Sequence, residues 1–346
     1  MGKCNKRDRK SGFALLIIVI SFLFLLPGGA AGKRTASKSD ADRRTDYKWQ
    51  WTFNTGYRHD DLDWSIQGPT PSFLTLPQRW SNLLSELTWQ DLKSLQLEFG
   101  LERRFRSNFK LKGELAYGLI LDGKNQDSDY WGDNRTFEFS RSNNSADGGD
   151  TWDFSVGFGY EFLFASGRFG LVPLFGLSYH GQDLTMTNGV QTVAAYGFEN
   201  LVSLGPFPGL NSTYNTDWYG PWTGLDFKIR TLKKDKKQLG HEFLLGIEYH
   251  FYAEYYARAN WNLRSDFAHP LSFEHEADGS GVILKGGYKY FLNVRWSLDF
   301  NGKYQKWETD PGTDRVFFSD GTMSETPLNE VNWESYALTF GVTCRW

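Results

Sequence analysis

Three aspartates fall within seven residues of a stretch that could do acid–base chemistry. Residues 125–134 read Asn-Gln-Asp-Ser-Asp-Tyr-Trp-Gly-Asp-Asn, with carboxylates at Asp127, Asp129 and Asp133. Asp127 and Asp129 are two residues apart, so a strand that continues into this stretch points both side chains the same way. Two carboxylates held that close raise the pKa of one of them, which suits a general base. The alternative is a solvated loop tip, because Asp and Asn favour turns for local hydrogen-bonding reasons.

A second group of acids and histidines lies within residues 264–280. Asp266 and His269 have two residues between them, and a Glu-His-Glu triplet is centred on His275. A carboxylate that orients an imidazole prepares it to take a proton from water. Plainer interpretations stay open, because His269 precedes Pro270 and could cap a turn, and His275 could belong to a solvated charge cluster.

The segments around these two groups alternate apolar and polar residues as β-strands do. Residues 47–57 are the clearest case, with Trp49, Trp51 and Phe53 on one face and polar residues on the other. The predicted strands are residues 47–57, 84–105, 109–121, 152–165, 169–187, 217–232, 240–263, 281–292, 295–307 and 333–346. Short turns alternate with long loops, which we predict at residues 59–82, 122–150, 188–216, 264–280 and 308–332.

The N-terminal residues predict export from the cytoplasm. Five basic residues precede a predominantly apolar run at residues 13–26, and small residues around Ala31 offer a cleavage site. We interpret residues 1–31 as a secretory signal peptide, with an uncleaved anchor as the alternative, although the run is short for a membrane span. Residues 32–45 are polar and predict a flexible periplasmic tail, so residues 46–346 form the folded domain.

Composition and charge favour a barrel in the outer membrane and exclude nucleic acid as a partner. Cleavage after Ala31 removes five basic residues and one acid, which shifts the formal net charge from −3 to −7. Phosphate binding needs a basic face, which such a chain lacks. Aromatic residues make up 17% of the chain, yet no later apolar run is long enough for a transmembrane helix.

The predicted fold class is therefore all-β. We expect a ten-stranded antiparallel transmembrane β-barrel with short periplasmic turns and five long extracellular loops, located in the bacterial outer membrane. Several predicted strands exceed the ~9–11 residues that a tilted span needs, so they should project beyond the bilayer. The acids and histidines lack a spacing that supports zinc, and we expect no metal and no cofactor.

Placed after the third strand, the acidic stretch resembles a motif of the omptin family of ten-stranded outer-membrane endopeptidases. Residues 127–133 read Asp-Ser-Asp-Tyr-Trp-Gly-Asp, and omptins carry an Asp-x-Asp-aromatic motif in their second loop. Residues 85–89, Ser-Glu-Leu-Thr-Trp, resemble the Ser-x-Leu-x-Trp opening of an omptin second strand. The resemblance covers the whole mature barrel in topology. It implies that Asp127 and Asp129 form one side of a catalytic cleft.

Omptins place an Asp-x-His pair in the fourth loop, opposite the paired aspartates. This chain offers Asp266 and His269, with one extra residue between them, or Glu274 beside His275. The resemblance implies that His269, oriented by Asp266, takes a proton from a water held by the paired aspartates. An acidic cleft attracts basic peptides, and outer-membrane lipid or lipopolysaccharide would be a further partner. A non-catalytic barrel that binds, adheres or stabilises the membrane is the alternative, and a narrow channel is the third possibility.

Overall fold

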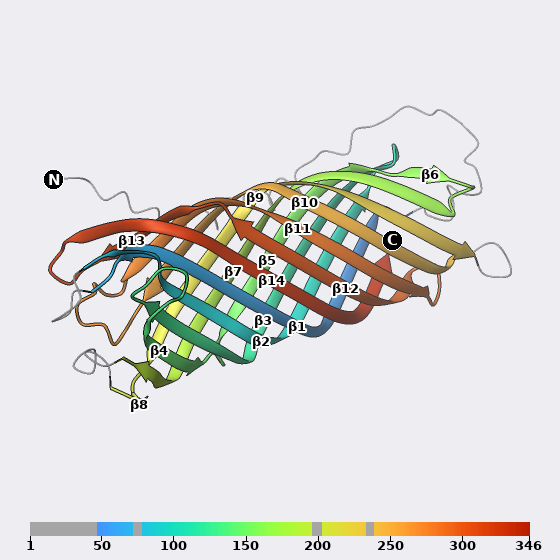
Figure 1. Ribbon diagram of the computed structural model, residues 1–346. Helices are drawn as coiled ribbons and strands as arrows, with labels where there is room; N and C mark the ends of the chain where they lie inside the picture. The colour runs from blue at the N-terminus through green and yellow to red at the C-terminus, as the bar shows by residue number, and fades with distance from the viewer. Residues whose placement is uncertain (1–46, 72–77, 196–202, 233–238) are drawn as a thin grey trace. The chain divides into compact units, whose positions relative to one another are not determined.

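The described part of the chain forms one closed antiparallel β-barrel (Figure 1). The computed structural model describes residues 47–71, 78–195, 203–232 and 239–346, so the predicted signal peptide and tail lie outside the described residues. The strands are β1 (Trp49–Pro69), β2 (Trp80–Arg104), β3 (Phe109–Tyr130), β4 (Glu138–Ser145), β5 (Gly149–Tyr160), β6 (Phe162–Phe164), β7 (Phe169–Ala194), β8 (Gly205–Pro206), β9 (Asn211–Leu232), β10 (Leu239–Asn260), β11 (Phe273–Phe291), β12 (Trp296–Thr309), β13 (Gly312–Phe317) and β14 (Met323–Arg345). None of the residues in these ranges belongs to a helix long and apolar enough to cross a membrane.

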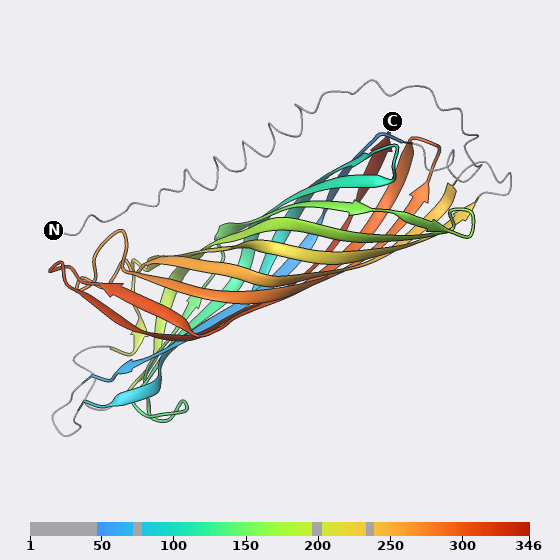
Figure 2. The same cartoon turned by 90° about the horizontal axis from the view of Figure 1, so that it is seen from above.

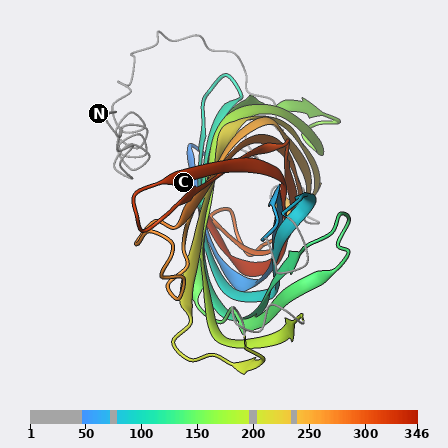
Figure 3. The same cartoon turned by 60° about the vertical axis from the view of Figure 1, so that its left-hand side comes forward.

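The sheet closes on itself because β1 pairs with β14. Around the ring the order is β1, β2, β3, β4, β7, β9, β10, β11, β12 and β14. β5 pairs with β3 and β7, the same neighbours as β4, and β13 pairs with β11 and β14, the same neighbours as β12. Each of these two pairs of strands therefore shares one position, and the ring has the ten positions that the sequence predicts (Figure 3).

Strict alternation separates the lipid-facing wall from the lumen. On β10, Phe243, Leu245 and Ile247 are 47%, 62% and 46% exposed. Glu242 and Glu248, which flank this segment on the opposite face of the strand, are buried. Period-2 geometry sends successive side chains to opposite faces. The exposed aromatic and aliphatic side chains of all strands form an outer apolar band, as a bilayer requires of a barrel.

Several strands extend further than their apolar alternation indicates. β1 runs on to Pro69, β3 runs on to Tyr130 and β11 already begins at Phe273. The predicted loops at residues 59–82, 122–150 and 264–280 are therefore wrong in part. The same holds for the loops predicted at residues 188–216 and 308–332, because β7 runs to Ala194, β9 begins at Asn211 and β14 begins at Met323. The end of β3 is polar on both faces, so its sequence lacks the apolar period, whereas Leu62, Trp64 and Ile66 continue an apolar alternation on β1 that faces the lumen. The backbone pairing continues along these strand ends, as between Ser85 and Asp129. Seven strands have 21 to 26 residues, more than the ~9–11 that a tilted span needs, so they are long enough to project beyond the bilayer as predicted (Figure 2).

Ion pairs fill the half of the lumen nearer the short turns. Arg230 donates to Glu161 at 2.7 Å and to Glu242 at 2.6 Å, and all three side chains are buried. Lys285 on β11 binds Glu114 on β3 at 2.8 Å, on a distant part of the ring. Charges are tolerated in such a space only when they are paired and hydrogen-bonded. A cavity of about 170 Å³ with polar walls remains within this charged region.

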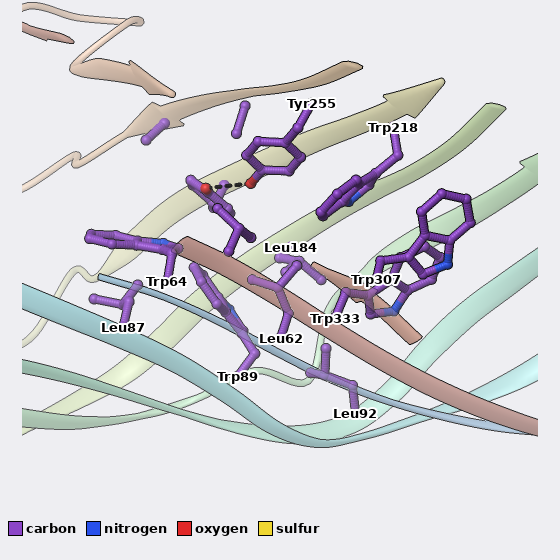
Figure 4. Close-up of a cluster of buried hydrophobic side chains, with 14 of the residues drawn as sticks. Leu62, Trp64, Leu87, Trp89, Leu92, Leu184, Trp218, Tyr255, Trp307 and Trp333 are labelled. Carbon is purple, nitrogen blue, oxygen red and sulfur yellow. Dashed lines mark hydrogen bonds between the residues drawn. The ribbon is translucent and has the colours of Figure 1, made fainter. Parts of the chain in front are cut away.

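Aromatic rings fill the lumen on the side of the long loops. We call this cluster the aromatic plug; its members are Trp64, Trp89, Tyr214, Trp218, Tyr255, Trp307 and Trp333 (Figure 4). Trp64 on β1 contacts Tyr214 on β9 with ring centroids 6.0 Å apart, and these two strands lie five positions apart in the ring. Rings from opposite walls therefore meet in the middle of the barrel.

Close packing in the lumen predicts that one glycine is intolerant of even a methyl group. A Cβ at Gly157 would lie 2.6 Å from Cη2 of the buried Trp222, whereas a Cβ at Gly100 would lie 3.4 Å from the nearest atom of Thr52. We expect Gly157→Ala to lower the free energy of unfolding by about 1–3 kcal/mol, because an indole ring has to move.

Urea unfolding of the refolded barrel, followed by tryptophan fluorescence, checks this expectation. Gly100→Ala is the matched control, since it adds the same methyl group at a lumen-facing position of β2. It should change the free energy of unfolding by much less, because its nearest neighbour lies 3.4 Å away. Equal effects of the two substitutions would contradict the packing described for Trp222.

Candidate functional site

A bulge in β3 turns Asp127 and Asp129, which we call the acidic pair, toward the lumen. Leu121 and Asp122 are neighbours, yet both are exposed on the outer wall. The pairing of β2 with β3 shifts at this level, and a shift of one residue moves every later side chain to the other face. Odd-numbered residues of β3 face lipid before the bulge and the lumen after it, and Asn125 is accordingly only 2% exposed.

Burial dominates the chemistry of the acidic pair. It raises the pKa of Asp127 well above the ordinary value, and the nearby charge of Asp129 raises it further. Burial also raises the pKa of Asp129, although hydrogen bonds from Ser85 and Ser140 act in the opposite direction. Asp127 has one hydrogen-bonding contact, with Trp261. The prediction of two coupled carboxyls with a raised pKa agrees with this geometry, with desolvation as the larger cause.

Arg264 is the positive charge that faces the acidic pair. Its charge lowers the pKa of both Asp127 and Asp129 and so offsets part of the effect of burial. Burial lowers the pKa of Arg264 itself, but the hydrogen bonds and charge of Asp266, together with the charges of the acidic pair, raise it above its ordinary value. The site therefore holds two half-buried carboxyls beside a guanidinium that stays charged.

Asp266 holds Arg264 in place. The Nε and Nη2 atoms of Arg264 donate to the two carboxylate oxygens of Asp266 at 2.9 and 2.8 Å. The guanidinium also lies over the ring of Phe267, with 4.1 Å between its carbon and the ring centroid. Both contacts use the planar shape of the guanidinium, which a lysine lacks. Asp266 therefore orients an arginine in this structure.

His269 is engaged elsewhere. Its Nδ1 lies 2.8 Å from Oδ1 of Asn260, and its Nε2 lies 3.2 Å from the backbone oxygen of Arg264. The structure does not bring Asp266 and His269 together as a hydrogen-bonded pair. The interpretation of His269 as a residue that stabilises a local turn fits these contacts, and the catalytic roles of Asp127, Asp129, Asp266 and His269 stay predictions.

His275 is a buried histidine, and its interpretation as part of a solvated charge cluster is wrong. The side chain is inaccessible to solvent, with Nδ1 at 2.8 Å from the hydroxyl of Tyr214 and Nε2 at 3.3 Å from Asp314. It lies on β11 against the edge of Trp64, with ring centroids 4.8 Å apart. The sequence hides this burial because Glu274 and Glu276 point to the other face of the strand.

Aromatic rings separate the acidic pair from this buried histidine. Trp261, which contacts Asp127, packs on Phe273 with centroids 4.7 Å apart, and Phe273 packs on His275 at 5.2 Å. A series of packed rings thus lies between Asp127 and the imidazole of His275. Trp261, Arg264 and Phe273 are the site residues that sequence reasoning missed, and the Arg-x-Asp spacing at residues 264–266 is the one signal that could have indicated the arginine fork.

The part of the chain that the structure describes contains no set of side chains arranged as metal ligands. No group of three or more His, Cys, Asp or Glu side chains there is arranged to hold an ion. The site as described can exchange protons and bind cationic or hydrogen-bonding groups through its carboxyls.

Comparison with known proteins agrees with the fold described above. The family model described as Pom, Protochlamydia outer membrane protein, matches residues 52–345. No curated protein sequence matches the chain.

Solved structures of bacterial outer-membrane proteins resemble the barrel. The outer membrane protease OmpT from Escherichia coli superposes with a TM-score of 0.68 at 12% identity, covering 86% of this chain and 97% of OmpT. OprG from Pseudomonas aeruginosa gives 0.34 at 10% identity over 87% and 97% of the two chains. The translocator domain of NalP from Neisseria meningitidis gives 0.33 at 8% identity over 97% and 98%. The match to OmpT confirms the predicted omptin-like barrel architecture, and at this identity it shows the fold alone.

The raised pKa of Asp127 predicts that its carboxylate destabilises the folded barrel. The folded pKa lies above the ordinary value of 3.8 for an aspartate, so wild-type stability falls as the pH rises from 3.8 through the folded pKa. We expect Asp127→Asn to leave the free energy of unfolding unchanged at about pH 3 and to raise it by roughly 1 kcal/mol or more at about pH 7. Each tenfold change in an ionisation constant corresponds to about 1.4 kcal/mol.

Urea unfolding measured across this pH range tests the expectation. Asp133→Asn is the control, because Asp133 is half exposed and pairs with Arg79 at 2.8 Å, so its loss should give no gain at any pH. A loss of stability in Asp127→Asn at neutral pH would show that the ionised carboxylate supports the fold instead.

Proposed function

Because this chain belongs to the Protochlamydia outer membrane protein family, we propose that it acts at the bacterial surface as a binding barrel that does not cleave peptides. The strands carry its long loops beyond the outer apolar band, so the chemistry available to a partner lies at the extracellular end. The proposal concerns the function of this extracellular end.

The observation that carries this proposal is the arginine beside the acidic pair. Water activation needs a free base within hydrogen-bonding reach of a water that the carboxylates also hold. Here Arg264, held by Asp266, supplies the positive charge that lowers the pKa of both Asp127 and Asp129. His269 has both ring nitrogens engaged by other groups, and misplacing a base by ~1 Å can cost about 100-fold in rate.

The aromatic plug argues against the third possibility, a channel. Trp89, Trp218, Trp307 and Trp333 are fully buried, and rings from opposite walls touch. Conduction needs a continuous polar path, and large apolar constrictions oppose the passage of water and ions. The charged cavity nearer the short turns is thus separated from the extracellular end.

An endopeptidase is the second candidate, and the raised pKa of the acidic pair favours it. A carboxyl whose pKa is moved toward neutrality is a better general base than an ordinary aspartate. For catalysis, Arg264 would have to leave the pair and His269 would have to turn toward it. The two candidates therefore differ in one measurable property, the hydrolysis of a basic peptide.

We expect the refolded barrel to leave basic peptides intact. Fluorogenic peptides with paired Lys or Arg residues are incubated with the full-length protein in micelles containing lipopolysaccharide, and OmpT serves as the positive control. The wild type and Asp129→Ala should show the same background rate, because neither presents an imidazole to the carboxylates.

A wild-type rate that exceeds the Asp129→Ala rate by about tenfold or more would establish the endopeptidase instead. Two further variants would then locate the base: His269→Ala should remove the activity if His269 acts, and Asp133→Ala should leave it unchanged.

A further inference from the structure

An open pocket of about 350 Å³ lies beside the bulge of β3, between β2, β3, β4 and β7. Six of its eight lining residues carry amide side chains: Gln90, Asn125, Gln126, Asn143, Asn144 and Asn188. We call it the amide pocket. Its volume falls at the lower end of the ~300–1,000 Å³ typical of sites for small molecules, but its lining is far more polar than is usual for them.

The amide pocket lies beyond the lipid-facing band. Leu121 is the last apolar side chain of β3 on the outer wall, at 59% exposure, and Gln126 follows it by five residues. At about 3.3 Å per residue this places Gln126 roughly 16 Å further along the strand. Asn143 is the cross-strand partner of Gln126 and is exposed on the same face. A molecule at the outer surface of the membrane can therefore reach these two side chains.

The amides offer acceptors that the protein leaves unused. The Nδ2 of Asn143 donates to Thr192 at 3.0 Å, and the Nε2 of Gln126 donates to Ser128 at 3.0 Å. Asn144 is 7% exposed and its Nδ2 donates to Asn125 at 2.7 Å, whereas its Oδ1 is buried without a partner among the described residues. A buried carbonyl oxygen left unpaired is costly, so a donor that reaches it is favoured.

The amide pocket carries little net charge. Lys124 is the one charged residue in its lining, and its ammonium lies 3.3 Å from the carboxylate of Asp91. A phosphate or sulfate would therefore meet a cation that is already paired, and a cation would find no free carboxylate in the lining. The pocket selects for neutral molecules with many hydrogen-bonding groups.

We propose that the amide pocket binds an uncharged saccharide. Sugar hydroxyls donate to amide oxygens and accept from amide N–H groups, and each amide carries both functions in one plane. Two sources share this chemistry, the sugar portion of lipopolysaccharide in the surrounding membrane and a free neutral oligosaccharide. The inference names a ligand class for the surface-binding barrel proposed above and rests on that function, but its site is separate from the acidic pair.

The experiment measures binding directly, so its result is independent of the peptide assay. Full-length protein is refolded into phospholipid nanodiscs and titrated with maltotriose, chitotriose and a sulfated heparin trisaccharide by saturation-transfer difference NMR and calorimetry. We expect a neutral trisaccharide to bind and the sulfated one to bind more weakly. Nanodiscs containing lipopolysaccharide distinguish the two sources, because bound lipopolysaccharide sugar would compete with the free trisaccharide.

Two variants test the assignment of residues. The double substitution Gln126→Leu and Asn143→Leu should weaken binding roughly tenfold or more, since it removes at least two hydrogen bonds. Lys93→Gln is the control; it removes an exposed charge on β2 outside the lining of the pocket and should bind as the wild type does. Asn143→Ala, a smaller change at an exposed position, should give a weaker loss in a barrel whose urea unfolding is unchanged.

Three results would overturn the proposal. The first is an absence of binding by every neutral trisaccharide, with no contact to lipopolysaccharide sugar detected in the nanodiscs. The second is equal affinity of the wild type and the double variant. The third is tighter binding of the sulfated trisaccharide that depends on Lys124, which would assign the pocket to anions.

Discussion

Contact between opposite walls of the barrel through aromatic rings is the constraint on which the rest of the structure depends. Eight strands enclose an interior that side chains nearly fill, and ten enclose slightly more. Tryptophan and tyrosine are large enough to reach the centre from both sides, and Trp64 on β1 meets Tyr214 on β9 there. Tyr214 also stacks on Trp89 and hydrogen-bonds to Tyr255, so the plug ties β1, β2, β9 and β10 together.

The plug also explains the electrostatics of the acidic pair. Asp127 and Asp129 lie on the lumen face above these rings, where few waters can solvate a carboxylate. A low local dielectric raises the pKa of an isolated acid and strengthens the attraction of a nearby cation. Arg264, in the loop between β10 and β11, supplies this cation. Asp127 and Asp129 therefore lie between the aromatic plug and Arg264, and this environment differs from the one that water activation needs.

A single bulge determines both candidate sites. After Leu121 and Asp122, the odd-numbered residues of β3 face inward and supply the acidic pair, whereas the even-numbered residues face outward. Gln126 thereby becomes part of the amide pocket on the outer wall. Gln126 and the acidic pair lie on opposite faces of the same strand, and a bulge at the edge of the apolar band is a local way to change which side chains meet the lumen.

Local patterns in the sequence determined the class of the fold and its place in the cell. Alternation is a property of neighbouring residues, so the ten strands, their lipid-facing sides and the outer-membrane location follow from it, as does the selection of Asp127 and Asp129. The end of β3 was missed because a strand without an apolar face leaves no period to detect, whereas the end of β1 was missed although Leu62, Trp64 and Ile66 alternate along it.

Tertiary structure alone decided the direction and surroundings of the acidic pair. Unbroken alternation from residues 109–121 would turn Asp127 and Asp129 toward lipid, and only the register shift against β2 turns them inward. The facing group is Arg264 rather than His269, and His275 is buried against Trp64. Each of these features depends on contacts between residues that are distant in the chain, either through strand register or across the lumen. Local sequence patterns do not reveal such contacts.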